Sequence, residues 1–463
     1  MTEQTPYKKR SIAAYRWAIF SVLAIAYFFV YFHRVSTAVM VTELRQTFHL
    51  QPTAAGFLAS VYFYSYAAAQ LFVGMLSDRY GARATISGFL FLSFIGATTF
   101  ALARSFPEAV FARALVGLGV AGIYVPALKV LSQWFGPADF ATLTGVLLSV
   151  GNVGGLVGTG PVALIVSQIG WRATIAVAGI VSLVLSVICW LVVKNRPAEI
   201  QAECGEAADR GGSPGTPLRP ACARCGPQGG LRATAAPDRK PWYDSLSTAL
   251  RYKQILLVGI VTFTRYGSTM GFQALWGGPY LVDVCRLSRA QAGSILALIS
   301  VGFIIGAPLA GYLSDKVVHN RKTMLIATYL LYALSWVPFA LFTGHLPLPV
   351  LALNTLIMGI AGGAGGSIAF SIAKESVPPA VVGSAVAALN IFPFIGAALY
   401  QPVMGYLVET QMKTGPAVGA YETAFKFCLV TVLAAAASLP WVRETMQTRK
   451  ASDAVVVHPR HPA

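Results

Sequence analysis

The chain has 463 residues, of which 56% are hydrophobic and only 11% charged, and its mean hydropathy is +0.63. Soluble globular proteins carry about 25% charged residues, so this composition excludes a water-soluble protein of this length and predicts one embedded in a lipid bilayer. The formal charge of +17, from 35 Lys and Arg against 18 Asp and Glu, fits an excess of bases on one side of a membrane and gives no reason to invoke nucleic acid.

Apolar stretches long enough to cross roughly 30 Å of hydrocarbon, about 20 residues each, recur along the whole chain. We predict twelve such spans. They are expected to be helices, because the alternating strands of about ten residues typical of a membrane barrel do not occur. The predicted fold class is therefore an all-α membrane protein with twelve transmembrane helices. Their approximate centres are Ala26, Tyr64, Ser93, Gly119, Gly154, Val181, Phe263, Val301, Leu331, Ile360, Phe394 and Val432.

A hydrophilic break divides these spans into six and six. It is rich in Gly, Pro, Ala and Arg and too polar to form a core, so it reads as a cytoplasmic linker. Cys222 and Cys225 in it have CxxC spacing, but no second pair or histidine cluster accompanies them, and we expect no metal and no cofactor. The predicted parts are a bundle over 1–195, the linker over 196–250, a second bundle over 251–445 and a cytoplasmic tail over 446–463.

The basic residues outside the spans gather on one predicted side. Placing the N-terminus inside puts the N-terminal bases, the loops after the second and eighth spans, the linker and the tail in the cytoplasm. The positive-inside rule therefore predicts that both termini are cytoplasmic and that the protein lies in the inner (plasma) membrane. The bases outside the linker and tail that carry this inference are Lys8, Lys9, Arg10, Arg16, Arg79, Arg83, Lys316, Arg321 and Lys322.

An internal repeat links the two halves. Gly74 precedes Asp78 by four residues after the second span, and Gly311 precedes Asp315 by four after the eighth, each followed by bases. Asp78 can pair with Arg83 or Arg113, or face the N-terminus of a neighbouring helix, and such a contact would hold in one conformation only. Asp78, Arg83, Arg113 and Asp315 are therefore gating candidates, and solvated charges that only set the orientation of the loop are the alternative.

These loops resemble the signature that follows the second span in the major facilitator superfamily. Residues 113–119 in the fourth span and 151–155 in the fifth resemble two further signatures of that family. The resemblance covers the chain apart from the linker and tails. It implies two pseudo-symmetric six-helix bundles and transport by alternating access.

Charged residues at the depth of the membrane centre are rare and costly, at roughly 2.5 to 3.5 kcal/mol each on insertion scales. Only Arg34, Arg113 and Arg265 fall there, and no Asp or Glu lies near the centre of any span. The predicted interior is therefore positively charged. A transported anion is the simplest partner, because guanidinium groups bind carboxylate or phosphate bidentately and stay charged at any pH.

Arg34 and Arg265 lie at matching depths in the first helix of each half, where substrate sites of repeat transporters are found. Tyr27 and Tyr31 precede Arg34 at helical spacing and share its face. We therefore predict that these four residues bind the anion. Packing roles for the two tyrosines and structural pairing of the arginines with polar groups remain the alternatives.

A narrower resemblance is to the organophosphate:phosphate antiporters and to bacterial sugar-phosphate or organic-anion permeases. Tyr27, Tyr31 and Arg34, residues 265–267 and the loop at 314–317 carry the first; residues 32–36, 170–172 and 272–281 carry the second. The resemblance implies that Arg34 and Arg265 bind the anionic group and that Tyr66 lines the same site. Gln70 and Gly151 stand where the antiporters have a lysine and a histidine. Gln273 and Asn390 are candidates to bind substrate hydroxyls, or else to join helices.

The predicted function is a secondary transporter of a small organic anion: a carboxylate, a sugar acid or a phosphate ester. An enzyme is not expected, since no HExxH, GxSxG or paired intramembrane carboxylates occur, and no Walker A motif is present for ATP. A nontransporting anion receptor of the same fold is the alternative. The coupling partner is a proton or a counter-anion, with a slight preference for proton symport through His33, which can equally be a structural residue.

Overall fold

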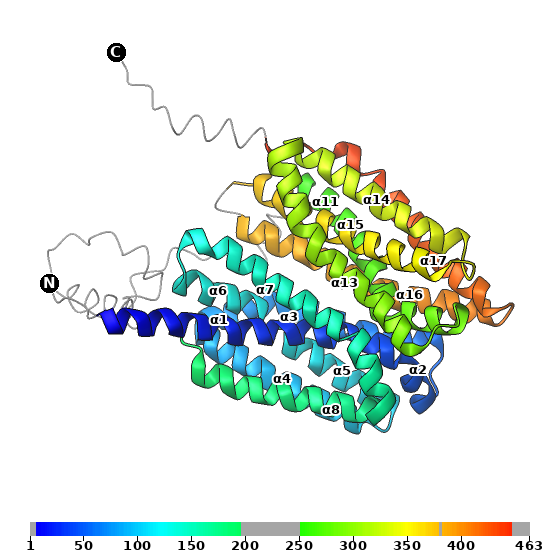
Figure 1. The fold of residues 1–463 in the computed structure, drawn as a ribbon, viewed down its shortest axis with the longest axis horizontal. Helices are drawn as coiled ribbons and strands as arrows, with labels where there is room; N and C mark the ends of the chain where they lie inside the picture. Colours follow the sequence, from blue (N-terminus) through cyan, green and yellow to red (C-terminus); the bar gives the residue numbers. More distant parts are fainter. Residues whose placement is uncertain (1–5, 196–250, 379–381, 447–463) are drawn as a thin grey trace, which may run out of the picture.

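The computed structural model describes residues 6–195, 251–378 and 382–446, and within them it contains helices and turns but no strand (Figure 1). The predicted all-α fold class is confirmed. The linker with Cys222 and Cys225, and the tail beyond Met446, lie outside the described residues.

The helices of the N-terminal half run back and forth along one direction (Figure 1). They are α1 (Pro6–Val35), α2 (Thr37–Phe48), α3 (Pro52–Tyr80), α4 (Ala82–Leu102), α5 (Phe106–Ala121), α6 (Tyr124–Trp134), α7 (Pro137–Val157) and α8 (Gly160–Val192). α8 contains Gly170 at φ +77°, a conformation that side chains rarely adopt, so this one labelled helix is two segments meeting at a glycine corner.

The C-terminal half repeats the arrangement with three π-helical segments. Its elements are α11 (Lys253–Gly271), η2 (Phe272–Trp276), α12 (Gly277–Pro279), η3 (Tyr280–Val284), α13 (Arg289–Tyr312), η4 (Leu313–Val318), α14 (Arg321–Leu341), α15 (Leu348–Glu375), α16 (Val382–Met412), α17 (Ala417–Ala436) and the 3₁₀ turn η6 (Leu439–Trp441). Elements α11 to η3 together form one continuous apolar span, Lys253–Val284.

Ten helices of the described chain are long and apolar enough to cross a membrane, and an eleventh is obtained when the bent α3 is taken as one span. The described chain thus shows at most eleven of the twelve predicted spans, and the span predicted around Gly154 coincides with a shorter apolar helix, Thr142–Val157 within α7. The outer faces of the spans carry large exposed apolar side chains, as lipid contact requires. Examples are Leu102, Leu191, Leu334, Leu353 and Val430.

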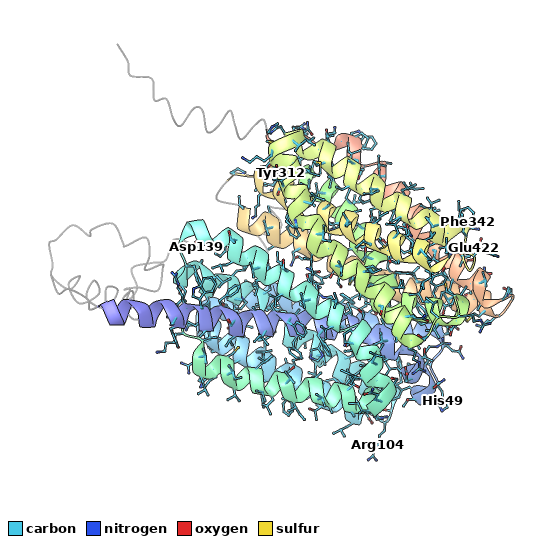
Figure 2. The ribbon with its side chains drawn as sticks, in the orientation of Figure 1. His49, Arg104, Asp139, Tyr312, Phe342 and Glu422 are labelled. Carbon is cyan, nitrogen blue, oxygen red and sulfur yellow. The ribbon has the colours of Figure 1, made fainter. Side chains whose placement is uncertain are left out.

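The two halves meet through α3 against α16 and through α13 against α7 and α8. Several backbone approaches between them lie toward the end of the bundle that carries α2, His49 and Arg104, here called the α2 end (Figure 2). A β-carbon on Gly278 would come within 2.8 Å of Ala38 O, and one on Gly405 within 2.6 Å of Pro52 O. The Arg289–Glu43 ion pair and the Thr53 N–H bond to Glu409 (3.2 Å) also join the halves there. The halves are thus closed against each other at the α2 end.

Candidate functional site

Arg34 lies at the end of α1. The helix is interrupted at Ser36, and the chain continues as α2. Its guanidinium carbon is 4.3 Å from the centre of the Tyr31 ring, 5.3 Å from Phe394 and 5.5 Å from Tyr66. Tyr31 and Tyr66 belong to the N-terminal half and Phe394 to α16 of the other half. Arg34 is therefore held by aromatic faces at the junction of the two halves, where cation–π attraction stabilises a desolvated charge.

Tyr266 connects the two arginines predicted to bind the anion. Its hydroxyl accepts a hydrogen bond from Nη1 of Arg34 at 2.9 Å, and its backbone directly follows Arg265 on α11. Its ring is near enough to both guanidinium groups for electrostatic interaction. Arg34 thus contacts the residue that directly follows Arg265, while the matching depth of the two arginines stays a prediction.

The predicted tyrosines form one aromatic group with Arg34. Tyr27 packs edge-on against Tyr31 at 5.5 Å and stacks on Tyr124 at 5.1 Å, and Tyr66 lies 4.3 Å from Phe394. A β-carbon on Gly151 would lie 2.8 Å from the ring of Tyr27 and 3.0 Å from that of Tyr31. These rings therefore occupy the space that a histidine at position 151 would need.

Arg265 is anchored from both sides. Its carbonyl oxygen accepts bonds from the hydroxyls of Tyr332 and Thr269, each at 2.8 Å. Its Nη1 donates to the carbonyl oxygen of Gly362 on α15. The side chain of Arg265 thus extends from α11, and its guanidinium lies along a glycine-rich stretch of α15.

Arg113 and His33 are in contact at the end of α1. Nη1 of Arg113 donates to the carbonyl oxygen of His33 at 3.1 Å, in the last turn of α1, where carbonyl groups lack helical partners. Its guanidinium also lies over Tyr62 at 4.8 Å. The His33 ring faces α8, with Nε2 at 3.4 Å from Oγ of Ser182. Arg113 therefore caps a helix end inside the protein.

Of the two polar side chains predicted for substrate hydroxyls, one joins helices and one is free. Nε2 of Gln273, in η2, donates to Oγ of Ser300 on α13 at 2.9 Å. Asn390 is half-buried on α16, one turn before Phe394, and its side chain makes no hydrogen bond to the described residues. Asn390 therefore lies on the helix face that reaches Arg34.

The buried charges of this region are all positive. Arg34, Arg113 and Arg265 are 3%, 1% and 4% exposed, and within the described residues none forms an ion pair. The Nε atom of each is buried and has no hydrogen-bond partner there. An unmet guanidinium edge in a buried site is what a bidentate anion would satisfy. No group of three or more His, Cys, Asp or Glu in the described chain is arranged to hold a metal.

Three of the gating candidates, Asp78, Arg83 and Asp315, lie at the opposite end from α2, which we call the termini end and which carries Asp139 and Tyr312 in Figure 2. Asp78 pairs with Lys129 of α6 at 2.7 Å, a residue that the sequence did not single out. Arg113, proposed as its partner, contacts Tyr62, which precedes Asp78 on α3 by roughly 24 Å of ideal helix. The pairing of Asp78 with Arg113 is therefore corrected to Lys129.

The remaining gating candidates take part in two related clusters. The backbone N–H of Arg83 donates to the side chain of Asn195 at 2.9 Å, and its guanidinium lies over Trp190 at 4.4 Å. In the second half, Asp315 pairs with Arg321 at 2.7 Å, and Arg321 also reaches Glu375 at 3.3 Å. Both clusters tie the start of the third span of a half to other segments at the termini end.

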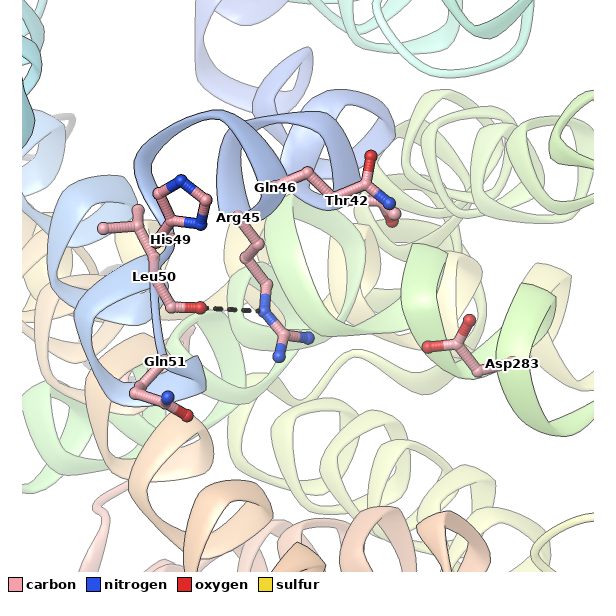
Figure 3. Close-up of a pocket in the computed structure, with 7 residues that line it drawn as sticks. All are labelled: Thr42, Arg45, Gln46, His49, Leu50, Gln51 and Asp283. Atoms are coloured by element: carbon pink, nitrogen blue, oxygen red, sulfur yellow. Dashed lines mark hydrogen bonds between the residues drawn. The ribbon is translucent and has the colours of Figure 1, made fainter. Parts of the chain in front are cut away.

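A separate polar pocket of about 460 Å³ opens at the α2 end (Figure 3). Arg45 of α2 and Asp283 of η3 lie on opposite walls, with His49 and Gln51 beside Arg45. Nε of Arg45 donates to the carbonyl oxygen of Leu50 at 3.4 Å, and its other nitrogens extend toward the Asp283 side. The pocket therefore brings opposite charges of the two halves face to face at the closed end.

Sequence reasoning missed several residues of the site. Tyr266, Phe394, Tyr332 and the glycines of α15 are ordinary residues of apolar helices, so nothing in their own spacing marks them. Their importance follows from neighbours supplied by other spans. Two signals could have found Tyr266: it directly follows Arg265, and it belongs to residues 265–267, which carry the resemblance to the antiporters.

Comparison with known proteins gives the relationship of the whole chain. The sequence matches the family described as Major Facilitator Superfamily over residues 23–277 and 258–459. It is 23% identical to the probable sulfoacetate transporter SauU of Cupriavidus necator, over 67% of this chain and 68% of that protein. It is 24% identical to the hexuronate transporter of Bacillus subtilis, over 89% and 90%. A bacterial homologue of the human lysosomal transporter Spinster, solved inward-facing and unoccupied, superimposes with a TM-score of 0.67 at 18% identity, covering 92% of this chain and 96% of that one.

Proposed function

The chain belongs to the major facilitator superfamily, a family of transporters and not of enzymes, and we propose that it carries a small organic anion across the membrane by alternating access. Arg34 and Arg265 bind the anionic group, and Tyr27, Tyr31 and Tyr66 form the aromatic wall beside it. Asn390 supplies a neutral hydrogen bond, while Gln273 acts through Ser300 on α13.

The observation that carries this proposal is the buried positive charge without a carboxylate. A desolvated arginine is costly unless it is paired, and Arg34 and Arg265 have only neutral partners among the described residues. Arg34 stands at the junction of the two halves and donates to Tyr266, which directly follows Arg265 in the C-terminal half, so an anion held by both arginines would contact both halves. A ligand that contacts both halves is what alternating access requires, since its binding must depend on their relative position.

The names of the relatives support a carboxylate or sulfonate as the anionic group. Sulfoacetate and hexuronates each carry such a group on a small polar body, which suits two guanidinium forks. Phosphate esters, carried by exchange, are the second candidate, because Arg34 and Arg265 match the arginines of the organophosphate antiporters. Crowding of position 151 by Tyr27 and Tyr31 speaks against that second candidate, because the antiporters place a histidine there.

The experiment is a thermal-unfolding screen of the purified protein with sulfoacetate, glucuronate, glucarate and glucose 6-phosphate, followed by variants. A ligand that binds the folded state raises the unfolding temperature by mass action. Arg34→Ala and Arg265→Ala should each weaken binding by about 100-fold, because truncating a buried charged partner costs about 2 to 5 kcal/mol. Lys at either position should restore little, since the fork is lost.

Arg104→Ala is the matched control, because Arg104 is exposed at the α2 end and should leave binding unchanged. Wild-type stabilisation by the anion in both Arg34→Ala and Arg265→Ala would refute the assigned site. A counterflow assay in proteoliposomes separates carrier from receptor: binding without any counterflow would favour the nontransporting alternative.

The orientation in the membrane is proposed from the bases at the termini end, which would face the cytoplasm of the cell under the positive-inside rule. Cysteines introduced at positions 49 and 139, at opposite ends of the bundle, test it. A membrane-impermeant thiol reagent should label His49→Cys in intact cells and Asp139→Cys only after permeabilisation. The reverse pattern would invert the topology.

A further inference from the structure

Three glycines of α15 lie against the side chain of Arg265. Gly362, Gly365 and Gly366 stand at i, i+3 and i+4, so they share one face of the helix. Gly362 supplies the carbonyl oxygen that accepts from Nη1 of Arg265. We call this face the glycine seat.

The three positions differ in what a β-carbon would meet. On Gly366 it would lie 3.0 Å from Nη2 of Arg265, and its next two nearest atoms belong to the same guanidinium. On Gly365 it would lie 3.5 Å from Cδ of Arg265 and from Oγ1 of Thr328, which is ordinary contact. On Gly362 it would meet the ring of Phe303 at 2.9 Å. Only at position 366 is the limiting neighbour the charged group itself.

The guanidinium that occupies the seat has an unmet side. Arg265 is 4% exposed, and its Nε is buried without a partner in the described chain. Nη1 of Arg265 donates to the carbonyl oxygen of Gly362. The direction of the free guanidinium edge therefore depends on how closely the guanidinium lies against α15. Bidentate binding of an anion is sensitive to that direction, because two parallel hydrogen bonds must form at once.

Resting on the proposed function, we propose that the glycine seat positions Arg265 for the anion and that Gly366 is its limiting residue. A methyl group there moves the guanidinium away from α15 by a few tenths of an ångström and turns its free edge. Gly366 is thus a positioning residue that acts through Arg265 and does not itself touch the anion.

The test compares Gly366→Ala with Gly365→Ala in the full-length protein, using whichever anion of the four-compound panel stabilises the wild type most. Gly366→Ala should weaken binding and raise KM about ten-fold while leaving kcat within two-fold. Gly365→Ala should bind within two-fold of wild type and be at least as stable, since alanine is the better helix former. Equal affinity of the two variants would overturn the proposal.

A double-mutant cycle with Arg265→Lys distinguishes positioning from mere packing. Lysine has no Nη2 atom, so in that background Gly366→Ala should not lower affinity further and should shift the unfolding temperature only as Gly365→Ala does. If Arg265→Lys binds too weakly to titrate, the unfolding temperatures of the ligand-free proteins complete the cycle. Additive effects of the two substitutions would overturn the proposal.

Failure of this inference and failure of the proposed function give different results. If Arg265→Ala binds the anion like wild type, the anion site itself is misassigned. If Arg265→Ala loses binding while Gly366→Ala and Gly365→Ala bind the anion equally well, the anion site is supported but the glycine seat does not position Arg265.

Discussion

The buried Arg321 at the termini end is stabilised differently from Arg34 and Arg265. At the termini end, Arg321 is neutralised by Asp315 and Glu375 and donates to Ser314. Among the described residues, Arg34 at the junction of the halves and Arg265 on α11 have only neutral partners: aromatic rings, a phenol and a backbone carbonyl. The charge of Arg321 is paired without a ligand, although its Nε is also buried without a hydrogen-bond partner in the described chain. The partners of Arg34 and Arg265 leave charge and a donor edge unmet, which is why we assign the anion to these two residues.

At this residue scale, Tyr266 offers a specific prediction. Its hydroxyl accepts from Arg34, and its own proton has no acceptor among the described residues, so it is free to donate to a bound anion. Tyr266→Phe keeps the ring but removes that donor. We expect affinity to fall about ten-fold or more, since a hydrogen bond to a charged group contributes about 1.5 to 3 kcal/mol. Isothermal titration of the purified variant measures this.

Tyr27→Phe is the control for that substitution. Tyr27 contacts Tyr31 and Tyr124 through its ring, and its hydroxyl makes no hydrogen bond within the described chain. The variant should bind within about two-fold of wild type. A larger loss in Tyr27→Phe than in Tyr266→Phe would exchange the roles we give them.

The sequence predicts part of this site because charge in an apolar span is a strong local signal. Arg34, Arg265 and the helical spacing of Tyr27 and Tyr31 need no partner to be noticed. Phe394 and Gly366 gain their roles from packing between spans distant in sequence, which a single sequence does not encode locally. The direction in which His33 faces was likewise open, and the structure turns its ring toward Ser182.

At the scale of elements, both halves cap their third span with the segment that follows their sixth. Asn195, after α8, accepts from the backbone N–H of Arg83 at the start of α4. Glu444, after α17, accepts from the N–H groups of Arg321 (3.1 Å) and Lys322 (2.8 Å) at the start of α14. Carboxylates favour helix N-termini because they satisfy free N–H groups and the helix dipole. The repeat seen in the loop sequences thus extends to how the helices are capped.

Glu444 gives a prediction about pH. Burial opposes its ionisation, but the N–H groups of Lys322, Met446, Arg321 and Thr445 outweigh this and lower the pKa of Glu444 below its usual 4.5. A lowered pKa in the folded state stabilises the protein above pH 4.5, and this contribution disappears as pH falls through the folded pKa. Glu444→Gln should therefore destabilise the protein by about 1 kcal/mol at pH 7. The deficit should shrink below pH 4.5.

Thermal unfolding in detergent between pH 7 and pH 3.5 measures this. Glu422→Gln serves as control, since Glu422 forms only an exposed pair with Lys426 at 2.5 Å and should change stability little. A deficit in Glu444→Gln that stays constant across the whole range would show that ionisation of Glu444 is not its source.

Asp78 gives the second prediction at this scale. Its partner Lys129 also donates to the carbonyl oxygen of Ser77 at 2.9 Å, so the pair fastens α6 to the end of α3 in this conformation. Asp78→Asn should slow transport about ten-fold but change anion affinity less than three-fold, because it alters the balance between conformations and not the site. Asp139→Asn, at the same end and exposed, should transport normally. Unchanged rates in Asp78→Asn would leave Asp78 only an orienting charge.

Hydropathy predicted the spans well because apolar length is set by the bilayer. It did not predict how they break. The interruption at Ser36 between α1 and α2, the π-helical segments η2 and η3, and the corner at Gly170 are changes in backbone geometry that hydropathy does not register. Where a helix is interrupted inside a membrane protein, other groups must satisfy its freed N–H and C=O groups. Arg113 does this for the end of α1.

At the scale of the whole molecule, the contacts between the halves define one state of the two-state carrier that we propose. Arg289–Glu43 and Thr53–Glu409 close the α2 end, where Arg45 and Asp283 face each other across the pocket. Transport requires these contacts to part while others form at the termini end. A site fixed between the halves would then be exposed to each side in turn.

The last prediction concerns what drives this exchange of states. An empty site with two unpaired arginines must carry that charge through the conformational change, and a desolvated charge is costly to move through the membrane. A bound anion neutralises it, so the loaded carrier should change state faster than the empty one. His33, the candidate proton site, faces Ser182 on α8, and the carbonyl oxygen of its own residue is held by Arg113. We therefore propose exchange of anions over proton symport.

Proteoliposomes decide between the two modes. Uptake of labelled anion should require an anion trapped inside and should not respond to an imposed pH gradient. His33→Gln should then exchange at close to the wild-type rate, whereas Arg34→Ala and Arg265→Ala should not exchange at all. Gradient-driven uptake into vesicles without internal anion would instead establish symport, and its loss in His33→Gln would return the proton site to His33. Because both modes use the same two arginines, this outcome changes the coupling without changing the site.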